Sequence, residues 1–144
     1  MIGPKHSAIA EGIEAVEQGN TALAMELFSQ VKATDMTPLL ASYKAYCLAC
    51  EQKNLSKAIN MGLKALQENQ THPLIYLNLG RIYYSAGFEK KALDFYRQGL
   101  RYQQHPLLLR RMEMLCLRRK RFFPFLERSN PLNIITGKIL SKIF

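Results

Sequence analysis

Long apolar runs are missing from this 144-residue chain, and no stretch approaches the roughly 20 apolar residues that a membrane helix needs. The N-terminal segment MIGPKHSAIAEGIEAVEQG has no apolar core of the kind found in secretory signal peptides. A strand-like alternation of apolar and polar residues is also lacking. Hydrophobic residues make up 48% and charged residues 22%, which is typical of a globular rather than a disordered protein. We therefore expect an all-α, cytoplasmic protein.

Cysteines are few, at Cys47, Cys50 and Cys116, and an odd number without a secretory signal argues against a disulfide framework. Cys47 and Cys50 have the spacing of a redox or zinc pair. They fall late in a predicted helix, however, and no second pair completes a zinc site, so we expect both to pack as small apolar residues. The sequence also lacks a Ser/His/Asp set and a nucleotide-binding glycine loop. These absences predict no enzyme activity, no cofactor and no metal.

Acidic residues are scarce in the C-terminal quarter of the chain. Residues 1–104 carry 11 Lys/Arg and 9 Asp/Glu, whereas residues 105–144 carry 9 and 2. Most of the formal net charge of +9 therefore lies after residue 104. This distribution suggests an acidic partner for that end of the chain, and the alternative is a solvated, solubilising end.

Residues 73–106 carry a spaced series of large and small side chains. The series runs aromatic, Leu-Gly, Tyr, Ala, aromatic, and it falls on Tyr76, Leu79, Gly80, Tyr83, Ala92 and Tyr96. This spacing resembles a tetratricopeptide (TPR) repeat, a helical hairpin of about 34 residues. The resemblance implies that Gly80 and Ala92 allow two helices to approach closely. It also implies further repeats, because one hairpin cannot bury its apolar faces alone.

The same residue types recur one and two repeat lengths earlier in the chain. Counted back in this way, Ala92 has counterparts at Ala58 and Ala24, and Gly80 has a counterpart at Gly12. Fixed-period identities of this kind indicate a repeat array, which tiles as 5–38, 39–72 and 73–106. Tyr46 replaces the glycine in the second repeat.

The resemblance implies an α-solenoid, a right-handed superhelix of three TPR hairpins over residues 1–106. Helices are expected over 6–18, 21–33, 38–51, 55–68, 73–86, 89–102, 107–121 and 132–143, with breaks at glycine, asparagine and proline turn signals.

The resemblance also implies a binding surface, because the first helix of each TPR hairpin lines a concave groove. Carried over by position, the peptide-groove candidates are Tyr43, Lys44, Asn78, Arg81, Tyr84, Ser85 and Leu115. The polar members could hydrogen-bond the backbone or the carboxylates of an extended peptide, and Tyr84 could pack against its side chains. The alternative is that they are ordinary solvated residues.

Residues 107–144 are expected to form a basic capping helix and a C-terminal helix on the same domain. In the capping helix, apolar residues share one face, and the other side carries a basic patch of Arg110, Arg111, Arg118 and Arg121. Such a patch suits an acidic protein, phosphates or an anionic membrane surface. No nucleic-acid-binding motif is present, so a protein partner is favoured over nucleic acid.

The last expected helix, residues 132–143, has an apolar face that either seals the end of the array or docks on a second copy to form a homodimer. The segment PFLERSNPLNIITGK resembles a C-terminal extension of a group of small bacterial TPR proteins. Together these patterns predict a non-enzymatic interaction module, a scaffold or adaptor that binds a peptide or partner helix in its groove. The alternatives are an anionic-surface binder that uses the basic patch, and a self-assembling subunit.

Overall fold

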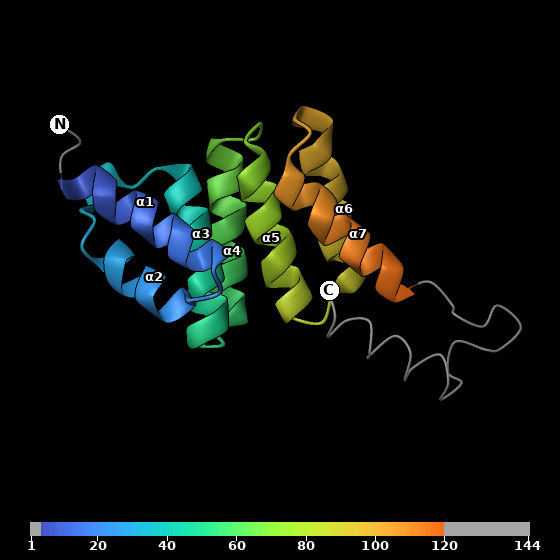
Figure 1. Ribbon diagram of the computed structural model, residues 1–144, viewed down its shortest axis with the longest axis horizontal. Helices are drawn as coiled ribbons and strands as arrows, with labels where there is room; N and C mark the ends of the chain where they lie inside the picture. The colour runs from blue at the N-terminus through green and yellow to red at the C-terminus, as the bar shows by residue number, and fades with distance from the viewer. Residues whose placement is uncertain (1–3, 120–144) are drawn as a thin grey trace, which may run out of the picture.

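A computed structural model of the chain describes residues 4–119, and this range is all-helical without a strand (Figure 1). The α-helices are α1 (Pro4–Glu17), α2 (Thr21–Ser29), α3 (Pro38–Glu51), α4 (Leu55–Glu68), α5 (Pro73–Ser85), α6 (Glu89–Tyr102) and α7 (Pro106–Arg119), and a 3₁₀ helix η1 (Ala33–Asp35) joins α2 to α3. The prediction of an all-α protein is confirmed over these residues. The end of the predicted helix 107–121 and the whole of the helix 132–143 lie outside them.

Helix α2 is shorter than the predicted 21–33, whereas α1 and α3 to α6 lie close to their predicted bounds. It ends at Ser29, whose hydroxyl donates a 2.6 Å hydrogen bond to the carbonyl of Glu26. Lys32 is extended, with φ −66° and ψ 150°, so the chain leaves the helical path before η1.

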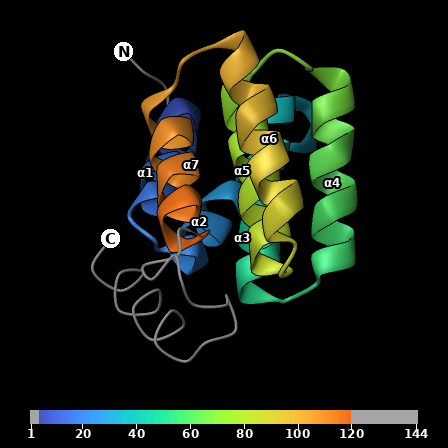
Figure 2. The same cartoon turned by 90° about the vertical axis from the view of Figure 1, so that its right-hand side faces the viewer.

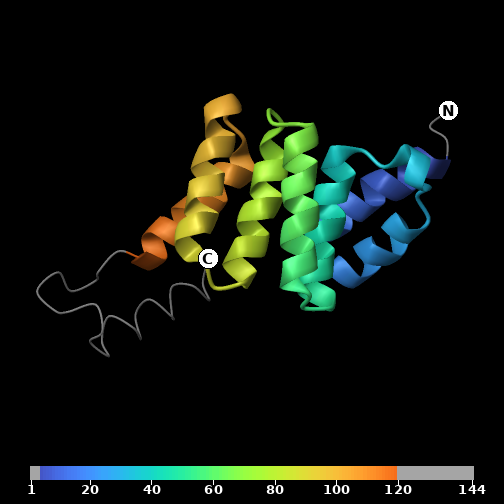
Figure 3. The same ribbon diagram turned by 180° about the vertical axis from the view of Figure 1, so that it is seen from behind.

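Successive helices pack as hairpins: α1 with α2, α3 with α4, and α5 with α6. The hairpins follow one another along the long axis of the molecule, as both faces of the ribbon show (Figures 1 and 3). Helix α5 also contacts α3, α4 and α7. Viewed from the end, α4 and α7 lie on opposite sides of the α5/α6 hairpin (Figure 2).

The tight turn inside each hairpin has the same backbone conformation from one hairpin to the next. Gly19, Lys53 and Gly87 have φ angles of 84°, 51° and 83°, a left-handed conformation that favours glycine. The next residue caps the following helix in two cases, where the side chains of Asn20 and Asn54 accept hydrogen bonds from backbone N–H groups. The local sequence thus sets where each hairpin turns.

Two glycines allow a ring from the second helix of a hairpin to lie directly on the backbone of the first. A Cβ atom at Gly80 would lie 2.1 Å from Cε1 of Tyr96, and one at Gly12 would lie 2.4 Å from Cε1 of Phe28. Both rings are buried. Gly80 and Tyr96 each stand two repeat lengths after Gly12 and Phe28, so the same contact recurs along the chain.

The buried side chains form three clusters that follow the order of the hairpins. One joins α1, α2 and α3; a second joins α3, α4 and α5 through Ala45, Ala58 and Ile82; the third joins α4 to α7. Leu108 and Leu115 of α7 belong to the third cluster and are buried against side chains of α5 and α6. Helix α7 therefore covers the end of the α5/α6 hairpin with its apolar face.

Candidate functional site

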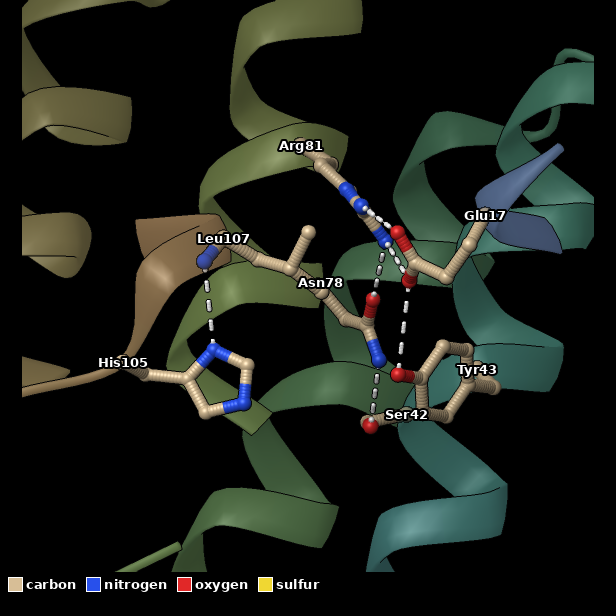
Figure 4. A network of polar contacts seen from close by, with 7 residues as sticks. All are labelled: Glu17, Ser42, Tyr43, Asn78, Arg81, His105 and Leu107. Carbon is tan, nitrogen blue, oxygen red and sulfur yellow. Dashed lines mark hydrogen bonds and ion pairs between the residues drawn. The ribbon is translucent and has the colours of Figure 1, made fainter. Parts of the chain in front are cut away.

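A buried arginine lies at the centre of the main polar network. Arg81 of α5 donates from Nη1 to Oε1 of Glu17 at 2.9 Å and from Nη2 to Oε2 at 2.7 Å (Figure 4). The side chain of Arg81 is 3% exposed and that of Glu17 is 25% exposed. This two-point geometry is the strongest arrangement that a guanidinium and a carboxylate can form.

Helix α5 orients Arg81 through a residue one turn earlier. Asn78 accepts a 3.2 Å hydrogen bond from Nη1 of Arg81 and donates from Nδ2 to Oγ of Ser42 at 3.0 Å (Figure 4). The hydroxyl of Ser42 donates in turn to the carbonyl of Leu39. Asn78 and Ser42 are fully buried, so α3 and α5 are joined by a satisfied polar contact inside the core.

Two tyrosines of α3 complete the surroundings of the ion pair. The hydroxyl of Tyr43 donates to Oε1 of Glu17 at 3.4 Å, and the ring of Tyr46 lies 5.3 Å from the guanidinium carbon of Arg81. Burial and the nearby charge of Glu17 raise the pKa of Tyr43, so its phenol stays protonated and remains a donor. Burial alone would lower the pKa of Arg81, but the hydrogen bonds and charge of Glu17 outweigh it and raise that pKa. One donor stays unused, because Nε of Arg81 is buried and has no hydrogen-bond partner.

Arginines of α7 extend this site. Arg118 donates to the hydroxyl of Tyr84, lies 5.9 Å from the centre of that ring, and forms a 3.5 Å ion pair with Glu89. Arg111 is half-buried, and its charge acts to lower the pKa of both Tyr46 and Tyr96. Burial nevertheless raises each of these pKa values to about 12.

The charges of Arg81 and Arg111 and the hydroxyls of Tyr46 and Tyr84 all act on Tyr96, so these groups gather in one place. We call this set, together with Arg118, the arginine–tyrosine cluster: Tyr46, Arg81, Tyr84, Tyr96, Arg111 and Arg118. Its members come from α3, α5, α6 and α7. Within residues 4–119, carboxylates pair with Arg81 and Arg118, but none pairs with Arg111. The cluster thus carries excess positive charge.

The predicted groove residues fall into two groups. Tyr43, Asn78, Arg81 and Leu115 are buried; Lys44 is half-buried; Tyr84 and Ser85 are exposed. The hydroxyl of Ser85 donates to the carbonyl of Arg81, one turn back on its own helix. Asn78 and Arg81 are therefore engaged by the chain itself, although the sequence pattern suggested that their polar groups were free for a peptide.

The predicted basic patch is divided by the structure. Arg110 is exposed, whereas Arg111 and Arg118 belong to the arginine–tyrosine cluster. Arg121 lies outside the described residues. Arg118 bonds to Tyr84 of α5, and the charge of Arg111 acts on Tyr46 of α3 and Tyr96 of α6.

Four residues of the polar network and the arginine–tyrosine cluster were missed as site residues by the sequence interpretation: Glu17, Ser42, Tyr46 and Tyr96. Glu17 lies far from Arg81 along the chain, and neither spacing nor composition marks it among the acidic residues. Tyr46 was noted only as the residue that replaces a repeat glycine. For Ser42 the sequence offered one signal, which is that it is a polar residue on the apolar side of α3.

Chemistry at the cysteines and metal binding find no support in the described part of the chain. Cys47, Cys50 and Cys116 are free thiols. Burial raises the pKa of Cys47 to about 12, which disfavours the reactive thiolate. Residues 4–119 contain no group of three or more His, Cys, Asp or Glu side chains placed to hold a metal ion.

No known family model matches this chain, and no curated protein is significantly similar to it. Each helix between residues 4 and 119 is too short or too polar to cross a bilayer. The function must therefore be inferred from the geometry of the chain itself.

Proposed function

We propose that the chain is a helical-repeat protein of the tetratricopeptide kind, a non-enzymatic module that binds an acidic peptide or partner helix at the arginine–tyrosine cluster. The repeat part of the proposal is supported by features that recur at a fixed period. The left-handed turn residues Gly19, Lys53 and Gly87 recur in this way. So does the contact between a helix glycine and a ring, at Gly12 and again at Gly80. A stack of such hairpins presents its first helices side by side, as α3 and α5 are here.

The unbalanced charge of Arg111 carries the binding proposal. Its side chain is half-buried and its charge acts on Tyr46 and Tyr96, and no carboxylate between residues 4 and 119 pairs with it. A cation in such a place gains from a carboxylate supplied by a partner, because partial burial reduces screening by water and salt. The half-buried Tyr46 and the exposed Tyr84 add flat, rigid surfaces with hydroxyl groups, which are favoured at protein interfaces.

A labelled hexaglutamate peptide tests the proposal, with hexaglutamine as the uncharged control. Fluorescence anisotropy should show binding of hexaglutamate only, and the affinity should weaken as salt is raised. Arg111→Glu should weaken binding by about tenfold or more, because it replaces an attraction with a repulsion in a partly buried place. Arg101→Glu changes the net charge equally at an exposed position of α6 and should alter the affinity less than about twofold.

If Arg111→Glu and Arg101→Glu lost hexaglutamate affinity equally, binding would follow net charge alone. If the wild-type chain did not bind hexaglutamate, the acidic-peptide proposal would be refuted. Phosphatidylserine vesicles, added in place of the peptide, test the alternative that the chain binds an anionic lipid surface. If the wild-type chain bound such vesicles but not hexaglutamate, the peptide site would be the wrong assignment.

A further inference from the structure

The carboxylate that occupies the Arg81 guanidinium comes from a distant helix of the same chain. Glu17 is the last residue of α1 and reaches α5 across α3, where both of its carboxylate oxygens bind Arg81 (Figure 4). The position that a partner's carboxylate would take beside the arginine–tyrosine cluster is thus already filled. Access to Arg81 depends on whether Glu17 can leave.

Arg81 is the fixed member of the pair. Its side chain is 3% exposed, bonds to Asn78 and lies against the ring of Tyr46. A guanidinium in this position cannot turn into water, and without a carboxylate it would be a buried, uncompensated charge. Whatever replaces Glu17 must therefore be an anion.

Glu17 is the member that can move. Its side chain is 25% exposed, and the turn after it, Gln18 to Asn20, is exposed at every residue. The negative charge also sits at the C-terminal end of α1, where the helix dipole disfavours an anion. A carboxylate from a partner would bind Arg81 without that penalty.

Glu17 leaves one of the three guanidinium nitrogens of Arg81 unbonded. Nε is buried and has no acceptor, while Nη1 and Nη2 bind the carboxylate of Glu17. A carboxylate that approached along the Nε edge would satisfy this group, which Glu17 leaves unpaired. Since an unpaired buried donor is costly, the site would gain from a second way of binding a carboxylate.

We propose that Arg81 is a carboxylate-binding position of the partner site, and that Glu17 is its tethered competitor, displaced when an acidic peptide binds. This inference rests on the proposed function and adds its regulation. While Glu17 occupies Arg81, the peptide cannot use this arginine. The apparent affinity for the peptide is therefore the intrinsic affinity multiplied by the fraction of molecules in which Arg81 is free. The chain would thereby reject weakly acidic segments and respond to those with several carboxylates.

The test compares hexaglutamate binding by the wild-type chain, Glu17→Gln and the matched control Glu14→Gln. Glu14 lies on the same helix, is exposed, and bonds only to Gln18 among its described contacts, so its replacement removes the same charge without freeing Arg81. Glu17→Gln keeps the shape of the side chain but weakens its hold on the guanidinium. We expect it to bind hexaglutamate at least tenfold more tightly than wild type, within the usual range of coupling between sites. Glu14→Gln should change the affinity less than about twofold.

Hydrogen exchange on the wild-type chain gives a readout that needs no substitution. Amides in the last turn of α1 should exchange faster when hexaglutamate is bound, because Glu17 has been released. Equal affinities for Glu17→Gln and Glu14→Gln, with unchanged exchange in α1, would overturn the competitor role while peptide binding itself stood. If neither the wild type nor Glu17→Gln bound hexaglutamate, the proposed function would fail together with the inference.

Discussion

The close approach of α5 and α6 at Gly80 makes a sharp prediction about stability. A methyl group at Gly80 would lie 2.1 Å from Cε1, 2.5 Å from Cδ1 and 2.8 Å from Cζ of Tyr96. Nonbonded carbon atoms prefer separations of about 3.5 Å or more, so the ring would have to move by roughly 1 Å. Tyr96 is 2% exposed and has little space in which to move.

The magnitude for Gly80→Ala follows from two opposing effects. Overpacking of a filled core costs about 1–3 kcal/mol, and contact with three ring atoms places this site near the upper end. Alanine improves helix propensity by about 1 kcal/mol over glycine. The net expectation is a loss of about 2 kcal/mol in the free energy of unfolding, measured by urea denaturation followed by circular dichroism.

Two comparisons make the Gly80 result interpretable. At Gly62 an added methyl group would lie 2.7 Å from Cδ2 of Leu79. This atom is the end of an aliphatic side chain that can rotate away, so Gly62→Ala should reduce the free energy of unfolding less than Gly80→Ala does. Tyr96→Leu removes the ring. The double variant with Gly80→Ala should therefore lose less free energy of unfolding than the two single variants lose together. A Gly80→Ala protein stabilised by about 1 kcal/mol, as expected for an open helix surface, would refute the packing argument.

Three further predictions concern pH, reactivity and capping. Burial and the charge of His105 lower the pKa of His72 below its ordinary 6.5, so the folded chain binds fewer protons than the unfolded chain in that range. The urea midpoint should therefore fall as pH drops from about 7 to 5, and His72→Asn, which keeps a helix-capping acceptor, should flatten that fall. Cys47, with its pKa raised to about 12, should resist a disulfide reagent at pH 8 until the chain is unfolded, as peptide mapping can show. Asn54→Ala should cost about 1 kcal/mol through loss of the α4 cap, whereas Asn60→Ala, at an exposed position inside α4, should not be destabilising.

Helix positions were predictable because their signals are local. Pro38, Pro73 and Pro106 each stand at the first residue of a helix, where the missing N–H costs nothing. Asn54 caps α4 from the position at which the turn was expected. The exception was α2, which ends at Ser29 rather than at the predicted residue 33. Apolar spacing continues to Val31 and therefore does not mark that end.

The candidate site was predictable only in part. The repeat resemblance placed Asn78 and Arg81 on the groove side of α5. Helical spacing placed Leu108 and Leu115 on the apolar face of α7, where both are buried, although Leu115 was also predicted to line the groove. It could not show that the polar pair is buried, because burial depends on which helices lie across it. It placed the arginines of α7 in one basic patch, and it could not show that Arg118 bonds to Tyr84 of α5 or that the charge of Arg111 acts on Tyr46 of α3.

By itself, the sequence determined the helices, the turns between them and the recurrence of turn and glycine positions, because each depends on residues within one or two helical turns. Only the tertiary structure decided which charges meet. Glu17 and Arg81 are far apart in the chain, and their two-point contact exists because α1 and α5 both pack on α3. Electrostatic pairing depends on distance and burial in space, and those are properties of the packed helices rather than of any single stretch.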